Sequence, residues 1–333
     1  MKALGTWALH VVRSREISVF IAFIVIVAVT AAVNPKFVFS PDGWKQLLIN
    51  PAILATLAIG EAFVIITRSF DLSVGSVLGL TAFMIGSAYI AWPGMPAVLA
   101  FALGIAFGAC LGLVNGGLVA LARVPGMVIT LGTMYIFRGI DILWAGSKRI
   151  NASDMGAGFL AVGNAQVLTI PALTITVLVA LVIATWYLRN TRGGREYYAV
   201  GSAPDAAELY GLKTGRRRLM AFVISGGMAG LAGAMFAARY ATVASSAGTG
   251  LELQAIGAAV IGGVAILGGS GTVIGAALGA LLLTTINSAL PVLGINSLWQ
   301  QAFVGALIIG AITLDRVLAA RRARRLESVR TTP

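Results

Sequence analysis

The chain alternates long apolar stretches with short polar ones. A membrane-crossing helix needs about 20 mainly apolar residues, and ten stretches approach that length. They cover residues 17–33, 47–67, 72–92, 96–122, 127–144, 168–188, 216–240, 251–268, 271–290 and 297–316. The third, fifth and eighth are short, glycine-rich or charged, so they are candidates for broken or re-entrant helices. The pattern predicts an all-α polytopic transmembrane helix bundle of about ten spans.

Two places in this pattern resemble each other. Asp71-Leu-Ser-Val-Gly75 opens the third stretch and Glu252-Leu-Gln-Ala-Ile-Gly257 opens the eighth. The fourth and ninth stretches each carry spaced glycines and one asparagine, Asn115 and Asn287. An offset of five stretches predicts two inverted five-helix halves, an arrangement found in many transporters.

Glycines recur four residues apart in several stretches, for example Gly104/Gly108, Gly108/Gly112 and Gly226/Gly230. This small-xxx-small spacing lets helix backbones approach closely. We expect tight helix packing from these glycines and no ligand site. Cys110 lies in the same Gly/Ala-rich run, and we expect it to be a small buried packing residue.

Composition supports a membrane protein. The chain has 333 residues, of which 58% are hydrophobic and 11% are charged, against about 25% charged in a soluble domain. The net charge of +12 would suggest nucleic acid in a soluble protein. Here the basic residues lie in short loops and tails, so membrane topology explains them better. We expect lipid around the chain and no nucleic-acid partner.

The basic residues also indicate an orientation. With both termini cytoplasmic, most of the 24 Lys and Arg residues fall on the inner side, as the positive-inside rule requires. The exceptions are Lys36, Lys45, Arg138, Lys148, Arg149 and Arg239. The sequence therefore predicts a multi-pass protein of the bacterial inner membrane. Its parts are a cytoplasmic segment 1–16, a transmembrane domain 17–316 with a cytoplasmic loop 189–216, and a basic cytoplasmic tail 317–333.

Signals for enzyme chemistry are lacking in this sequence. One cysteine and one histidine, Cys110 and His10, allow neither an intrachain disulfide nor a Cys/His metal site, which needs about four ligands. None of the lysines follows a glycine, so the chain has no P-loop. We expect no catalytic residue, no metal and no cofactor in this chain.

Four charged residues, Glu61, Arg138, Asp141 and Glu252, fall within or near the apolar stretches. Each costs roughly 3 kcal/mol at the centre of a membrane helix, so such residues usually pair or face an aqueous cavity. Arg138 and Asp141 are three residues apart on one helical face. The two charges either neutralise each other in a structural ion pair or line the pathway of a transported solute.

Asp71 and Ser73 have the character of a helix start. A polar helix start at this depth fits a broken helix that lines a cavity, and it fits a capped ordinary span equally well.

Several motifs in order resemble the ribose-type, carbohydrate-uptake class of ABC importer permeases. The resemblance runs from about residue 47 to 316. Its motifs are Thr67-Arg-Ser-Phe-Asp71-Leu-Ser-Val-Gly75-Ser76, Asn115-Gly116, Pro125-Gly-Met-Val-Ile-Thr-Leu-Gly-Thr133-Met-Tyr-Ile-Phe-Arg138-Gly139, Gly248-Thr-Gly-Leu-Glu252-Leu-Gln-Ala-Ile, Val260-Ile-Gly-Gly263, Gly268-Gly-Ser-Gly-Thr272, Trp299-Gln300 and Asp315.

The sequence departs from the common family pattern at Arg68-Ser69-Phe70, where many relatives have Gly-Gly-Ile. Thr67-Arg68 followed by Asp71, and the run from Arg138 to Trp144, look more like the rhamnose and autoinducer-2 branches. Those branches often pair two different permeases.

The resemblance implies a permease subunit that translocates a monosaccharide or sugar-like solute by alternating access. Rhamnose, autoinducer-2, ribose or another pentose or hexose would fit. The implied partners are two cytoplasmic ATPase domains that use ATP and Mg, a second permease subunit, identical or paralogous, and an extracytoplasmic sugar-binding protein. ATP hydrolysis would lie outside this chain, which would not be an enzyme.

Site residues follow from the same resemblance. The loop that couples to the ATPase would comprise Pro204, Asp205, Ala206, Ala207, Glu208 and Gly211. Pro204 suits a first helical turn and Gly211 a helix stop. The polar candidates for the translocation pathway are Asp71, Ser73, Ser76, Asn115, Thr130, Thr133, Glu252, Gln254 and Asn287.

Two alternatives remain open at this point. The intramembrane acids would also suit a secondary carrier driven by H⁺ or Na⁺. A branched-chain amino-acid ABC permease of the related superfamily would share the same architecture.

Overall fold

The computed structural model describes residues 15–122, 124–299, 301–306, 309–310 and 313. Within this part of the chain, eight helices are long and apolar enough to cross a membrane, and each lies where an apolar stretch predicted one. They are α2 (Arg15–Val33), α4 (Pro41–Ile66), α5 (Val74–Ala91), α6 (Ala97–Ala122), α7 (Gly126–Ala145), α9 (Ala172–Asn190), α12 (Thr214–Tyr240) and α14 (Val273–Val292). The expected all-α membrane bundle is confirmed.

Two of the ten expected spans are not observed as long helices in the described part of the chain. Residues 251–268 form only the short helix α13 (Leu251–Ile261), and an irregular loop follows it. In that loop Gly263, Gly268, Gly269 and Gly271 have positive φ angles, which end the helix. The expectation of a full span there is wrong, and the expectation of a broken segment is confirmed. Residues 297–316 begin with the turn η2 (Ser297–Trp299) and lie partly outside the described residues.

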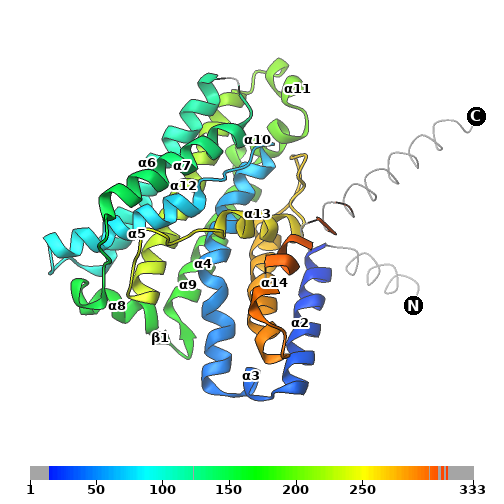
Figure 1. Ribbon diagram of the computed structural model, residues 1–333. Helices are drawn as coiled ribbons and strands as arrows, with labels where there is room; N and C mark the ends of the chain where they lie inside the picture. Colours follow the sequence, from blue (N-terminus) through cyan, green and yellow to red (C-terminus); the bar gives the residue numbers. More distant parts are fainter. Residues whose placement is uncertain (1–14, 123, 300, 307–308, 311–312, 314–333) are drawn as a thin grey trace, which may run out of the picture.

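Helix α4 runs through the middle of the bundle (Figure 1), and its residues from Ala52 to Ile66 are buried. Helix α12 packs against α6, α4 and α5, while α14 packs against α4, α2 and α13. On the outside, large apolar side chains such as Val98, Leu143 and Val182 are exposed. An apolar exterior around a packed interior is the arrangement that lipid as solvent allows.

The seam between α6 and α12 is made of glycines. A Cβ on Gly108 would lie 2.2 Å from the carbonyl oxygen of Gly226, and a Cβ on Gly112 would lie 2.2 Å from that of Phe222. The expectation of close packing at these glycines is confirmed. Cys110 is exposed, so the expectation of a buried residue there was wrong. Two residues past Gly108, it lies on the opposite face of α6 from the glycine stripe.

Short elements lie at the two ends of the bundle (Figure 1). At the end where α4 begins lie α3 (Lys36–Phe39), η1 (Ala152–Asp154), α8 (Ala157–Asn164) and the antiparallel strands β1 (Gln166–Val167) and β2 (Ile170–Pro171). At the other end, the basic loop 189–216 forms α10 (Arg192–Ser202) and α11 (Pro204–Leu209). The helical character expected of that loop is confirmed.

Candidate functional site

The chain between α4 and α5 buries a set of hydrogen-bonded polar side chains. Asp71 Oδ1 accepts hydrogen bonds from the Ser73 N–H at 3.0 Å and the Ser73 hydroxyl at 2.6 Å. The hydroxyl of Ser225 on α12 donates to Asp71 Oδ2 at 3.1 Å. Asp71 therefore holds Ser73, the residue at the N-cap of α5, and its contact with Ser225 also joins this helix start to α12. The sequence placed the helix start correctly, but among the described residues no side chain accepts a hydrogen bond from the first N–H groups of α5 itself.

Three further helices reach the same point. On α6, Asn115 Nδ2 donates to Ser73 Oγ at 2.7 Å, and on α4, Glu61 Oε1 accepts the Asp71 N–H at 3.0 Å. On α7, Thr130 Oγ1 accepts the Leu72 N–H at 3.1 Å. We call these residues the break cluster: Glu61, Asp71, Ser73, Asn115, Thr130 and Ser225.

The break cluster is closed to solvent, since its six side chains are all buried. Ser76 is also buried, and Thr133 packs beside Thr130 and donates to its carbonyl oxygen at 3.3 Å. Glu61 Oε2 and Ser76 Oγ are buried without a hydrogen-bond partner in the described part of the chain. Buried polar atoms without partners are costly.

Arg138 and Asp141 form the expected pair, with Arg138 Nη1 3.8 Å from Asp141 Oδ2. Arg138 Nη1 also donates to the carbonyl oxygens of Ser245 at 2.9 Å and Ala247 at 2.7 Å. Arg138 thus holds the loop that precedes α13, while Asp141 lies beside its guanidinium.

Glu252, in the first turn of α13, faces the start of α5. Its Oε1 accepts the Gly250 N–H at 3.1 Å, and a Cβ on Gly75 would lie 2.2 Å from Oε2. A carboxylate at a helix N-terminus is favourable because unpaired N–H groups gather there. The two similar motifs of the sequence, at 71–75 and 252–257, therefore pack against each other.

A polar cavity of about 440 Å³ opens beside α13. Of the nine pathway candidates, the structure places Gln254 on its wall. Asn287 lies one turn beyond Thr284 on α14 and does not line the cavity. The full lining is Asn50, Ile53, Leu54, Phe236, Tyr240, Thr242, Ala244, Ser246, Ala247, Gly248, Thr249, Leu251, Gln254 and Thr284.

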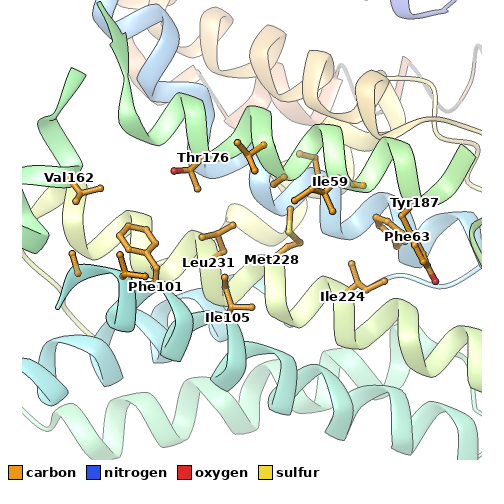
Figure 2. Close-up of a pocket in the computed structure, with 16 residues that line it drawn as sticks. Ile59, Phe63, Phe101, Ile105, Val162, Thr176, Tyr187, Ile224, Met228 and Leu231 are labelled. Carbon is orange, nitrogen blue, oxygen red and sulfur yellow. The ribbon is translucent and has the colours of Figure 1, made fainter. Parts of the chain in front are cut away.

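A larger apolar groove of about 640 Å³ lies between α4, α6, α9 and α12. Figure 2 shows that Ile59, Phe101 and Leu231 project into it. Only Thr176 and Tyr187 bring hydroxyl groups, and Thr176 donates its own to the Ala172 carbonyl oxygen at 3.0 Å. Carbon walls of this kind suit apolar matter and offer no path to a polar solute.

Helix α11 carries the residues expected to couple. Pro204 stands in its first turn, Asp205 follows, and Gly211 adopts a φ of 80° just after the helix ends. Ala207 is buried and anchors the helix, while Asp205, Ala206 and Glu208 are exposed. Beside them, Leu209 and Tyr210 are 89% and 88% exposed, which is unusual for large apolar side chains outside a membrane span.

Arg68 connects this end of the bundle to the break cluster. Its Nε donates to the Gly201 carbonyl oxygen at 2.5 Å and its Nη2 to that of Ser202 at 2.8 Å. These carbonyls end α10, just before α11. The sequence signal that pointed to Arg68 was its departure from the family pattern, which did not indicate what it contacts.

Helix α10 makes two further contacts with the transmembrane part. The Gly269 N–H donates to the Ile66 carbonyl oxygen at 2.9 Å, and a Cβ on Gly201 would lie within 3 Å of both. The Tyr198 hydroxyl donates to the Gly271 carbonyl oxygen at 3.0 Å, and burial raises the pKa of Tyr198, which keeps it a donor. The end of α10 is therefore joined to the connection that follows α4 and to the irregular loop that follows α13.

Comparison with known proteins agrees with this architecture. Residues 44–312 match the family model described as branched-chain amino acid transport system / permease component. The autoinducer 2 import system permease protein LsrC of Enterobacter sp. (strain 638) is 37% identical over 324 residues, which cover 96% of this chain and 93% of that protein.

Proteins of the same description in two other bacteria are also similar. That of Salmonella typhimurium (strain LT2) is 37% identical over 314 residues, covering 94% of this chain and 89% of its own. That of Yersinia pseudotuberculosis is 35% identical over 303 residues, covering 91% and 85%. No solved structure matches the chain.

A polytopic helix bundle with a broken segment at α13 and a basic loop of short helices fits the class of membrane permeases. The chain belongs to the branched-chain amino acid transport system / permease component family. It is the membrane-spanning permease subunit of an ABC importer, a transporter and not an enzyme, in the inner membrane. An importer of this kind works with ATPase and substrate-binding partners. The family match therefore decides in favour of an ABC permease and against the alternative of an ion-coupled secondary carrier.

Proposed function

We propose that this permease carries a monosaccharide or sugar-like solute, of which autoinducer-2 is the leading candidate. The observation that carries this proposal is the 37% identity to an autoinducer 2 import permease over 96% of the chain. The description of the matching family names branched-chain amino acids, so a leucine-type substrate is the competing candidate.

In this proposal ATP and Mg are bound and used by two separate ATPase domains, and this chain binds no cofactor. A second permease, identical or paralogous, completes the pore, and an extracytoplasmic binding protein delivers the solute. Both termini and the loop 189–216 lie on the cytoplasmic side. The basic residues of that loop support this orientation.

Helix α11 is the proposed contact to the ATPase, through Pro204, Asp205, Ala206, Ala207, Glu208 and Gly211. Exposed Leu209 and Tyr210 beside exposed Glu208 offer an apolar and charged surface for a partner protein. Arg68 supports the transmission of movement, because it ties α10 to the segment that leads into Asp71.

Translocation would proceed by alternating access around the start of α5 and the broken segment at α13. The break cluster and the polar cavity supply the polar groups along this route. The proposed pathway residues are Asp71, Ser73, Ser76, Asn115, Thr130, Thr133, Glu252, Gln254 and Asn287.

The coupling assignment is tested by charge reversal in the complex of permease, ATPase and binding protein in proteoliposomes. Glu208→Arg should abolish most ATP-driven uptake and leave membrane insertion intact. The matched control is Asp42→Arg, since Asp42 is exposed at the opposite end of the bundle. Uptake by Glu208→Arg equal to that of the control would contradict the assignment.

A further inference from the structure

The polar cavity combines amides with hydroxyls. Asn50 on α4 and Gln254 on α13 contribute side-chain amides, which both donate and accept hydrogen bonds. Thr249 donates its proton to the Ser246 carbonyl oxygen at 2.8 Å, and Thr284 donates to that of Ala280 at 2.7 Å. Their oxygen lone pairs therefore remain for hydroxyl donors of a solute. Such a wall is complementary to a molecule that carries several hydroxyl groups.

An aromatic surface lies beside these groups. Phe236 and Tyr240 are one turn apart on α12, both line the cavity, and their ring centroids are 4.6 Å apart. Ile53 and Leu54 on α4 add apolar wall. The carbon-bound hydrogens of a small polyol can pack on such rings while its hydroxyls reach the amides, which is the usual division of a small-molecule site.

The cavity wall carries no charge. None of the described residues that line it is Asp, Glu, Lys or Arg. Glu252 belongs to the same helix as Gln254, but its carboxylate faces Gly75. Arg138 does not line the cavity, and its Nη1 donates to the carbonyl oxygens of Ser245 and Ala247. An amino acid would leave its ammonium and carboxylate groups without counter-charges here, which is unfavourable.

We infer that the polar cavity is a transit site for a neutral, polyhydroxylated solute, which Asn50 and Gln254 hold by hydrogen bonds against Phe236 and Tyr240. This inference rests on the proposed function and narrows it, since it excludes leucine-type solutes at this site. Asn50, Phe236 and Tyr240 were not among the residues that the sequence indicated.

The first test removes each amide but keeps the size of the side chain. The solute is autoinducer-2, ribose or rhamnose, whichever the wild-type complex transports. Asn50→Leu and Gln254→Leu should each lower its initial rate of uptake roughly threefold to tenfold, which is the effect of one lost hydrogen bond. The matched control is Gln166→Leu, because Gln166 is an exposed amide on β1, and its uptake should equal that of the wild type. Unchanged uptake in both cavity variants would overturn the inference.

The second test needs no transport. Cys110 is the single cysteine and is exposed, so Cys110→Ala gives a cysteine-free background. In that background Thr249→Cys places a thiol on the cavity wall. Millimolar autoinducer-2, ribose or rhamnose should slow its alkylation at least twofold, and leucine should not. Ser153→Cys, at an exposed position of η1, controls for effects outside the cavity.

The two tests separate the inference from the proposed function. The transit site would be overturned if leucine protected Thr249→Cys as strongly as the sugars do. It would also be overturned if none of these solutes slowed the alkylation. A wild-type complex that shows no ATP-driven sugar uptake would instead defeat the proposed function, while the protection experiment would still decide the inference.

Discussion

The guanidinium of Arg68 lies on the last carbonyl group of α10, with Nη2 2.8 Å from the oxygen of Ser202. Arg68 is the second residue after α4, and Asp71, which organises the break cluster, follows three residues later. One side chain thus joins the helix pair proposed to contact the ATPase to the buried polar residues at the start of α5. Hydrogen bonds between rigid elements are one way in which coupling between distant sites is carried.

Arg68→Gly should uncouple the transporter without unfolding it. Arg68 has a φ of 63°, which costs a non-glycine residue roughly 1–2 kcal/mol, so glycine relieves strain while it removes two hydrogen bonds. We expect a melting temperature close to that of the wild type and severalfold less solute transported per ATP hydrolysed.

The control for this variant is Arg195→Gly, since Arg195 is an exposed basic residue of α10. If Arg68→Gly kept the wild-type ratio of transport to hydrolysis, the proposed connection would be wrong.

The glycine seam makes a prediction about stability. Gly108→Ala places a methyl group 2.2 Å from the Gly226 carbonyl oxygen, so α6 and α12 must move apart, at a cost of about 1–3 kcal/mol or more. Gly117→Ala on the same helix meets nothing within 4 Å and should leave stability equal or slightly raised. Thermal unfolding of the detergent-solubilised protein checks both, and equal melting temperatures would refute the seam.

The break cluster makes a second prediction about stability. Ser225→Ala leaves Asp71 Oδ2 without the hydroxyl that donates to it at 3.1 Å, and an unsatisfied buried acceptor costs about 1–3 kcal/mol. Ser288→Ala is the matched control, because the hydroxyl of Ser288 donates to the Thr284 carbonyl oxygen of its own helix. Chemical denaturation should show the loss for Ser225→Ala alone.

The long helices, the start of α5 and the break at α13 could be predicted from the sequence. The eight long helices follow from apolar length, and the start of α5 follows from the polar residues Asp71 and Ser73 that precede an apolar run. The break at α13 was also expected, because glycine and Glu252 interrupt the apolar run. These signals are local, so one stretch of sequence contains them.

The contacts between distant segments could not be predicted in this way. Ser225 and Asp71 are 154 residues apart, and Arg68 and Ser202 are 134 residues apart. Asn50 lies in an ordinary-looking helix and reaches the polar cavity only through the packing of α4 against α13 and α14. A single sequence contains no signal for which polar residues will meet.

The attachment of α10 to α12 should depend on pH. Burial raises the pKa of Glu196, but hydrogen bonds and charge from Arg217 and Arg192 outweigh it, so the pKa lies below its ordinary value of 4.5. A lowered pKa stabilises the folded state above the ordinary value, and this stabilisation is lost as the pH falls through the lowered pKa.

Glu196→Gln should therefore be less stable than the wild type at pH 7, with the gap closing below about pH 4.5. Melting temperatures across this range measure the effect. A gap that stays constant down to pH 3 would show that the Glu196 interactions do not stabilise the fold.

ATP-driven uptake by the complete complex in proteoliposomes tests the central claim most directly, with labelled autoinducer-2 and competing solutes. Uptake should require ATP and both partner proteins, and excess ribose or rhamnose should compete with it while leucine should not. Uptake driven by an ion gradient without ATP, or competition by leucine alone, would contradict the account.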